Sequence, residues 1–352
     1  MNGALVYEDY LSLYKNKKIT GKGFNKSQIQ PSSIDLSLSE ECYEIKTSFL
    51  SSKNKVRDKL KKIYTKKINI EKPKILLKNK TYIVKLNEKL ILNKSIKGHC
   101  NPKSSTGRLN IFCRTILDYC DEYEKIPINY KGEMFLEITT RSFNIKISKG
   151  DMLNQMRLTK NFHNYLNDLQ IKKINTNNPL IFSDKKNYID NGLKVSVDLS
   201  DDKKICAYEA RKTNKYINFN KINYYDLKNF WKPLKPKNKS LIIEKNKFYI
   251  LKSKEKIRIP NNLAGEMIPY DTSIGDFRVH YAGFFDPGFG DPFGSYAVLE
   301  VKTNELPFII EDGQTIARIK YEKLNKKTSI VYGSSINSNY QNQKLALSKH
   351  FK

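Results

Sequence analysis

Residues 101–111, NPKSSTGRLNI, gather side chains that are able to bind phosphate. Ser104 and Ser105 offer adjacent hydroxyl groups, and Lys103 and Arg108 supply positive charge that strengthens hydrogen bonds to phosphate oxygens. In a tight turn, successive backbone N–H groups can donate to the same oxygens. The stretch therefore predicts a phosphate-binding turn, and a polar hairpin turn without a ligand is the alternative.

A second group of residues, in the turn Asp286-Pro287-Gly288-Phe289, places a carboxylate beside an aromatic ring. Such a pair suits the recognition of a sugar. Asp286 can accept a hydrogen bond from a 3′-hydroxyl, while Phe289 can lie under a ribose and leave no room for a 2′-hydroxyl. A plain turn with a packed phenylalanine is the competing interpretation.

Two glutamates stand in similar surroundings, Glu137 within M-F-L-E-I and Glu300 within A-V-L-E-V. In a β-strand, side chains alternate between the two faces, so each carboxylate points away from its immediate apolar neighbours. Each glutamate is therefore expected to point either into a lined cleft or into water.

These residues belong to an internal repeat, in which the second half of the sequence resembles the first. Asp35 stands 102 residues before Glu137, and Asp198 stands 102 residues before Glu300. Both copies consist of short alternating segments separated by turns, which indicates an all-β fold with minor helices, built as a tandem repeat of two barrel or sandwich domains. The matching segments are QPSSIDLSL at 30–38 with KVSVDLSDD at 194–202, KNKTYIVK at 78–85 with KNKFYILK at 245–252, and MFLEITTRSFNIKISKGDMLNQMRL at 134–158 with AVLEVKTNELPFIIEDGQTIARIKY at 297–321.

The repeat predicts a first domain over residues 1–165, a linker over 166–188 and a second domain over 189–352. The two copies differ where chemistry is expected. With Gly98 aligned to Gly265, the second copy has Asp271 in place of Ser104, which disfavours phosphate binding there. The first copy has no D-P-G-F turn and carries a longer segment instead.

Two helices are expected, near residues 5–15 and at 53–64. In the second helix, Val56, Leu60 and Ile63 form one apolar face among lysines. We expect this basic helix to be a solvated surface helix with one packed stripe rather than a nucleic-acid-binding arm.

The chain has 352 residues and a formal net charge of +28, which would attract anionic ligands from nucleoside triphosphates to nucleic acid. Lys, Asn, Ile and Tyr are abundant throughout, so we attribute the charge mainly to A·T-rich coding, and we expect no nucleic-acid partner because no recognised binding module is present. Five cysteines without a C-x-x-C pair and four scattered histidines predict neither a disulfide framework nor a zinc site. Without a membrane-spanning apolar run or a secretory signal pattern, a cytoplasmic protein with no membrane partner is expected.

Taken together, these motifs make the sequence resemble the zinc-independent dCTP deaminases of the trimeric dUTPase superfamily, most strongly their tandem, double-length bacterial form. The likeness covers most of both halves and implies two dUTPase-like distorted β-barrel, or β-clip, domains. The family's motifs stand here as Lys103-Ser104-Ser105 with Arg108, Ala282 with Asp286-Pro287-Gly288-Phe289, Val298-Leu299-Glu300, and a tail from Tyr332 to Tyr340 and Gln343.

The resemblance implies hydrolytic deamination of dCTP to dUTP and ammonia, with Mg²⁺ carried by the triphosphate and no zinc. By carry-over, Glu300 would be the general base, with Ser104 and Arg108 positioning the attacking water; Glu137 is its counterpart in the first copy. The triphosphate and base contacts would come from Lys103, Ser105, Tyr332, Tyr340 and Gln343, with the backbone near Ala282 reading the pyrimidine edge. Relatives of this superfamily are homo-oligomers, usually trimers, that assemble one site from neighbouring barrels. By this resemblance, the first copy would supply the phosphate-binding motif of a site, and the second copy would supply the base-binding turn and the glutamate.

Two departures from the family pattern reduce the expected phosphate contacts. Gly283 and Phe284 stand where single-copy enzymes usually have His and Arg, and Asn339 replaces a lysine of the tail. Three alternatives stay open: dUTP diphosphatase activity, a bifunctional enzyme that releases dUMP, and a non-catalytic nucleotide sensor. The mid-strand Glu300 and the absence of a Gly-rich C-terminal motif favour the deaminase over the first.

Overall fold

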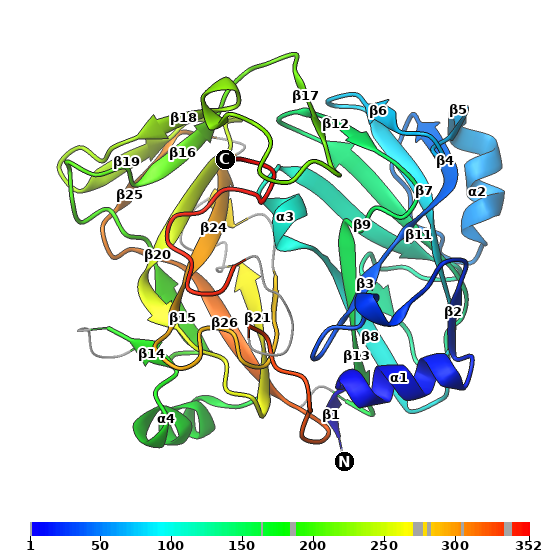
Figure 1. The fold of residues 1–352 in the computed structure, drawn as a ribbon, viewed down its shortest axis with the longest axis horizontal. Helices are drawn as coiled ribbons and strands as arrows, with labels where there is room; N and C mark the ends of the chain where they lie inside the picture. Colours follow the sequence, from blue (N-terminus) through cyan, green and yellow to red (C-terminus); the bar gives the residue numbers. More distant parts are fainter. Residues whose placement is uncertain are drawn as a thin grey trace. The chain divides into compact units, whose positions relative to one another are not determined.

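The computed structural model describes residues 2–162, 165–183, 188–269, 277–279, 283–303, 306–333 and 340–352. The chain forms two compact units, shown along the sequence in Figure 1. Unit 1 comprises Met1–His163, Thr213–Tyr225 and Leu324–Ser329; unit 2 comprises Asn164–Lys212, Asp226–Lys323 and Ile330–Lys352. Ala282, expected to lie against the pyrimidine, falls outside the described residues.

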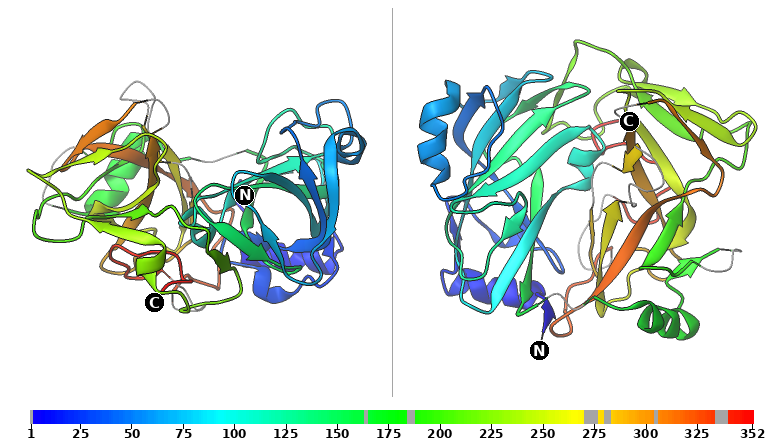
Figure 2. Two further views of the ribbon diagram at one scale, coloured as in Figure 1. Left: turned by 90° about the horizontal axis from the view of Figure 1, so that it is seen from above. Right: turned by 180° about the vertical axis from the view of Figure 1, so that it is seen from behind.

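Unit 1 is built from three sheets, whose strands wrap around a common interior in Figure 2. Alternating burial along its long strands explains the curvature, because apolar side chains on one face pack inward. The first sheet has the order β5 (Tyr64–Asn69), β4 (Leu38–Ile45), β7 (Thr81–Ile91), β11 (Lys131–Thr140), β9 (Ile111–Leu117), with β2 (Ile19–Gly21) also on β7. The second has β1 (Gly3–Ala4), β13 (Asn154–Lys160), β8 (Ile96–Pro102), β10 (Lys125–Ile126), with β3 (Ile34–Leu36) also on β13, and the third has β17 (Tyr216–Asn218), β12 (Asn144–Ile147), β6 (Lys74–Leu76).

Unit 2 has the same plan in the same chain order. Its first sheet runs β18 (Trp231–Leu234), β16 (Ala207–Ala210), β20 (Tyr249–Ile257), β24 (Ser295–Thr303), β22 (Phe277–Val279), with β14 (Ile181–Phe182) on β20. The others run β15 (Leu193–Ser196), β26 (Thr315–Lys323), β21 (Leu263–Pro269), β23 (Phe284–Phe285), and β19 (Ser240–Ile243) with β25 (Phe308–Glu311). The predicted all-β tandem repeat is therefore confirmed.

Strand register corrects one part of the sequence alignment between the copies. Asp35 lies opposite Gln155 in unit 1, and Lys194 lies opposite Arg318 in unit 2. Because Gln155 and Arg318 are equivalent in the long matching segments, the counterpart of Asp35 is Lys194. The alignment of Asp35 with Asp198 was wrong by four residues, and the shared spacing of 102 residues is a coincidence.

A buried carboxylate in each unit supports the corrected register. In unit 1, Glu88 accepts hydrogen bonds from the backbone N–H of Ser37 (3.0 Å) and from its hydroxyl (2.7 Å). In unit 2, Glu255 accepts from the N–H of Ser196 (2.9 Å) and from its hydroxyl. Ser37 follows Asp35 by two residues, and Ser196 follows Lys194 by two residues. The same serine–glutamate hydrogen bonds therefore hold the equivalent strand in both units.

In the part of the chain that the structure describes, four α-helices lie on these sheets: α1 (Tyr7–Lys15), α2 (Val56–Ile63), α3 (Ser104–Gly107) and α4 (Asp168–Asn177). The first two were predicted. Val56 and Leu60 of α2 are buried in a cluster with Tyr43, Ile83 and Phe135, so the helix packs through its apolar stripe and exposes its lysines. The segment 166–188, expected to be a linker, contains α4 and β14 and belongs to unit 2.

Two pieces of the second half of the chain complete unit 1. β17, at residues 216–218, pairs in parallel with β12. Asn325 donates its backbone N–H to the carbonyl of Ala4 (2.9 Å), and Lys326 forms an ion pair with Asp9 (2.6 Å). Parts of the second half of the chain therefore belong to unit 1, so no single point in the sequence separates the two units. Among the described residues, no helix is both long and apolar enough to span a membrane.

Candidate active site

The predicted phosphate turn forms one turn of helix at the end of β8. The backbone N–H groups of Thr106 and Gly107 donate to the carbonyl of Lys103 (2.8 and 3.0 Å), and the N–H of Arg108 donates to the carbonyl of Ser104 (3.0 Å). These three N–H groups are therefore used inside α3 and are not available to a phosphate. The prediction of successive backbone donors was wrong for these three N–H groups, and the phosphate binding predicted here would depend on the side chains and the first turn.

The side chains of this turn differ in exposure. Arg108 is 3% exposed and Ser105 is buried, whereas Ser104 and Lys103 are partly exposed. Lys103 forms an ion pair with Asp35 of β3, a nearly buried carboxylate. This partner was not found from the sequence, where Asp35 served only to mark the repeat.

Glu137 lies in the middle of β11 and is 1% exposed. Its Oε1 accepts from two nitrogens of Arg114 on the neighbouring strand β9, at 2.5 and 3.1 Å. The Arg114 guanidinium in turn lies 3.6 Å from the ring centroid of Tyr123 and 4.7 Å from that of Phe112. The charge of Glu137 is thus balanced by Arg114, and its side chain is buried within unit 1.

Glu124, on the segment that replaces the D-P-G-F turn, is a partly exposed residue whose carboxylate oxygen Oε2 is buried. It accepts from the N–H of Thr115 (3.0 Å) and the amide of Asn154 (3.4 Å), while its Oε2 has no hydrogen-bond partner among the described residues. Burial raises the pKa of Glu124 from about 4.5 to about 8. Burial also raises the pKa of the nearby Cys100 and Cys113 thiols. The raised pKa favours the protonated form of Glu124.

In unit 2, the D-P-G-F turn is closed by the hydrogen bond from the Phe289 N–H to the Asp286 carbonyl (3.1 Å). Gly288 has φ +95°, which favours glycine, and a Cβ there would lie 2.2 Å from Val331. The Phe289 ring is buried, with its centroid 4.9 Å from that of Phe285 and 5.9 Å from that of Tyr332. In this structure Phe289 is packed against its own chain, as the competing interpretation of the turn expected.

The C-terminal tail lies along this turn. The Tyr332 N–H donates to the carbonyl of Pro287 (2.8 Å). Gln341 donates to the carbonyl of Gly288 (3.2 Å) and accepts from the N–H of Gly290 (3.2 Å). Gln341 was missed by sequence reasoning; its position two residues before Gln343 in Y-Q-N-Q was the available signal.

The tail also reaches the strand that carries the second glutamate. Gln343 donates its amide to the carbonyl of Tyr296 (2.8 Å), near the start of β24, and the Tyr340 hydroxyl accepts from the N–H of Lys349 (3.2 Å). Glu300 lies further along β24, 5% exposed, opposite Ile250 of β20. Unit 2 thus brings together the glutamate strand, the turn and the tail, while Lys103, Ser104, Ser105, Arg108 and Glu137 belong to unit 1.

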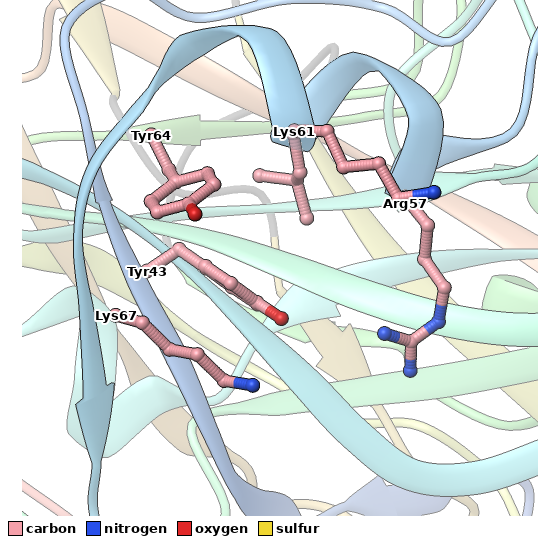
Figure 3. Close-up of a pocket in the computed structure, with 6 residues that line it drawn as sticks. Tyr43, Arg57, Lys61, Tyr64 and Lys67 are labelled. Atoms are coloured by element: carbon pink, nitrogen blue, oxygen red, sulfur yellow. The ribbon is translucent and has the colours of Figure 1, made fainter.

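A pocket of about 170 Å³ opens elsewhere on unit 1, beneath α2. Figure 3 shows Tyr43 and Tyr64 side by side, with Lys67 alongside Tyr43 and with Arg57 and Lys61 extending from the helix. None of the residues predicted to bind the nucleotide lines it. Arg57 is held by Glu41 and Glu133, at 2.7 and 2.6 Å. Among the described residues, no cluster of three or more His, Cys, Asp or Glu side chains is arranged to hold a metal ion.

The sheet order repeated in both units, the K-S-S-x-x-R turn of unit 1, and the D-P-G-F turn and buried glutamate of unit 2 define a tandem all-β protein that carries nucleotide-enzyme motifs. Residues 1–162 match the N-terminal domain of 2′-deoxycytidine 5′-triphosphate deaminase, and residues 167–351 match its C-terminal domain. The chain therefore belongs to the 2′-deoxycytidine 5′-triphosphate deaminase family, and it is an enzyme of nucleotide metabolism.

A solved structure supports the same assignment. The chain is similar to the crystal structure of 2′-deoxycytidine 5′-triphosphate deaminase from Agrobacterium tumefaciens, with a TM-score of 0.90 and 35% sequence identity. The match covers 96% of this chain and 99% of that one. A comparison with curated protein sequences found no match.

Proposed function

We propose that the chain catalyses the hydrolytic deamination of dCTP to dUTP and ammonia, with Glu300 as the general base. The observation that carries the choice of glutamate is the place of Glu300, in the same unit as the D-P-G-F turn and the C-terminal tail. Glu137 is ion-paired to Arg114, whereas Glu300 lies at the equivalent place in the unit that carries the D-P-G-F turn and the tail. A base must be able to take a proton from water, and a carboxylate held by a guanidinium is poorly suited to do so.

In the proposed reaction, the Glu300 carboxylate takes a proton from water as the water oxygen bonds to C4 of cytosine. The protonated acid then passes the proton to N3. The proton of the new C4 hydroxyl is transferred to the N4 amino group, so that the C4–N4 bond breaks, ammonia leaves and C4 becomes a carbonyl. One water is consumed and dUTP is formed. Ser104 and Arg108 would position the water and stabilise the developing charge.

The remaining predicted residues are assigned to binding. Lys103, Ser105, Tyr332, Tyr340 and Gln343 would hold the triphosphate, which arrives with its Mg²⁺ as part of the substrate. Asp286 would accept from the 3′-hydroxyl, Phe289 would pack near the sugar, and the backbone near Ala282 would read the pyrimidine edge. Because these residues are divided between the two repeats, the proposal requires both repeats, within one chain or between subunits of a homo-oligomer such as a trimer.

Product analysis tests the reaction. The protein is incubated with dCTP and Mg²⁺, and dUTP, dUMP, pyrophosphate and ammonia are resolved over time. Equal amounts of dUTP and ammonia support the deaminase. Appearance of dUMP and pyrophosphate from dCTP would show the bifunctional enzyme, and hydrolysis of dUTP without ammonia release from dCTP would show a dUTP diphosphatase. Binding without turnover would leave the sensor alternative.

A further inference from the structure

The lysine of the K-S-S motif is held by a carboxylate from another strand. Lys103 stands between the end of β8 and α3, and its ammonium forms an ion pair with Asp35 of β3. The side chain of Lys103 is 25% exposed, whereas that of Asp35 is 9% exposed. The pair thus has one end anchored inside unit 1 and the other at its surface.

Asp35 is itself firmly placed. Its carbonyl accepts from the amide of Gln28 (2.8 Å), and Gln28 also donates to Glu88 (2.7 Å). Two residues further on, Ser37 donates to the same buried Glu88. These hydrogen bonds connect the Asp35 carbonyl and Ser37, just after β3, to the buried Glu88. The backbone of Asp35 is therefore firmly placed, and its side chain offers Lys103 a fixed partner.

The second repeat lacks this pair. The residue at the position of Asp35 is Lys194, which forms an ion pair with Asp190 (2.9 Å). Counted from Gly98 and Gly265, the counterpart of Lys103 in the sequence is Tyr270, which lies outside the described residues. The carboxylate thus accompanies the lysine of the K-S-S turn, and the repeat that lacks that lysine has the opposite charge at the carboxylate's position.

We propose that Asp35 is a positioning residue that holds the Lys103 ammonium ready for the phosphate chain of the substrate. This inference rests on the proposed function, in which Lys103 binds the triphosphate. A lysine side chain is a flexible stem that loses rotamer freedom when it binds, so a rigid carboxylate partner lowers the cost of fixing it in place. Asp35 acts through Lys103 and has no contact with the reacting atoms.

Steady-state kinetics with dCTP test the inference in the full-length protein. We expect K103Q to raise KM by one to two orders of magnitude and D35N to raise it roughly 10-fold, with kcat changed by less than about 3-fold in each. The D35N/K103Q double variant should be no worse than K103Q alone, because the loss of Asp35 has no effect once Lys103 is absent. A merely structural role would instead lower the amount of active enzyme without changing KM.

Asp198→Asn is the matched control. Asp198 forms a comparable, partly exposed ion pair with Lys252, in unit 2 and outside the proposed site. It should leave KM within about 2-fold of the parent. Glu at position 35 keeps a carboxylate, so D35E should restore part of the lost KM and keep the test decisive if D35N folds poorly. Inhibition by inorganic tripolyphosphate should weaken in D35N and K103Q in parallel.

The outcomes separate the two proposals. If K103Q leaves KM unchanged, Lys103 does not bind the triphosphate and that part of the proposed function is wrong. If K103Q raises KM but D35N does not, or if the two effects multiply in the double variant, Asp35 does not act through Lys103 and this inference alone is overturned.

Discussion

Each of the two repeats has a glutamate at the equivalent position of its first sheet, but the residues that contact the two glutamate strands differ. Glu137 lies on β11 and is paired with Arg114 of β9. The guanidinium of Arg114 lies against the rings of Tyr123 and Phe112. Glu300 lies on the equivalent strand β24, whose first residues contact the C-terminal tail. Glu137 is the buried partner of an ion pair, and Glu300 is the glutamate that we propose as the base.

The segments that surround the two glutamate strands also differ. In unit 1 the stretch that replaces the D-P-G-F turn supplies Tyr123, which lies over Arg114, and Glu124, whose pKa is raised by burial. In unit 2 the shorter turn is held by Tyr332 and Gln341 from the tail. In unit 1 the region beside Glu137 is therefore occupied by side chains of the same unit, whereas unit 2 carries the D-P-G-F turn held by its tail.

The substitution Glu300→Gln, with the largest expected effect, tests most directly whether the two glutamates have different roles. Glu300→Gln removes the proposed base while keeping size and polarity, so kcat for dCTP deamination should fall by about 10²–10⁴-fold, a range typical of general acid–base catalysis. The measurement is ammonia release under saturating dCTP. Retention of more than a tenth of the parent kcat would contradict the assignment.

Glu137→Gln is the matched control for that experiment. Its kcat should stay within about 3-fold of the parent, but the protein should lose about 1–3 kcal/mol of stability, because the partly exposed Arg114 loses its partner. Urea unfolding measures the second effect. An inactive E137Q together with an active E300Q would exchange the roles of the two units.

The next largest effect concerns Glu124. Its pKa is about 8 in the folded protein and near 4.5 when unfolded, so folding favours the protonated form. The stability it contributes is fully present below pH 4.5 and is lost as the pH rises to 8. By linkage the loss is roughly 4–5 kcal/mol at most. Unfolding free energies measured from pH 5 to 9 should fall in the parent and stay flatter in E124Q.

Glu133 gives the opposite sign within the same unit. Arg57 and Lys85 lower its pKa to about 2 despite partial burial. Its contribution is present above pH 4.5 and is lost as the pH falls toward 2. In E133Q the parent's slope between pH 5 and 9 should persist. A slope that disappeared in E133Q as well as in E124Q would show that Glu124 is not its source.

A smaller effect tests the turn that distinguishes unit 2. Gly288→Ala places a Cβ at φ +95° and within 2.2 Å of Val331, so the tail or the turn must shift. We expect a loss of about 2–4 kcal/mol, from the left-handed conformation and from overpacking, measured as a lowered melting temperature. Gly283→Ala is the control, because a Cβ there meets no atom of the described residues within 4 Å, and its melting temperature should match the parent's. Equal losses in both variants would argue against a tightly packed turn.

Much of the fold could be predicted from the sequence because alternation and turns report directly on strands. The long match of 134–158 with 297–321 reveals the repeat for the same reason, since core positions of paired strands are constrained together. The ion pairs of Glu137 and Lys103 could not be predicted in this way. The first joins facing residues of two strands, and the second joins β3 to the residue between β8 and α3, so only the folded sheets bring the partners into contact.

The short match around Asp35 failed for a related reason. Ser37 precedes its carboxylate partner by 51 residues, whereas Ser196 precedes its partner by 59. The connecting segments of the two copies therefore differ in length by eight residues. A five-residue pattern of serine, aspartate and leucine is too short to fix an alignment across such a difference, and the buried hydrogen bonds to Glu88 and Glu255 fix it instead.

The smallest effect tests that corrected correspondence. Ser37→Ala and Ser196→Ala each remove a hydroxyl that donates to a buried carboxylate, so each should cost about 1–3 kcal/mol in urea unfolding. Ser200, which the sequence match paired with Ser37, is exposed and donates to Asp198 (2.7 Å). Ser200→Ala should therefore change stability by no more than about 0.5 kcal/mol. If Ser200→Ala were as costly as Ser37→Ala while Ser196→Ala were neutral, the original alignment, and not the strand register, would describe how the two repeats correspond.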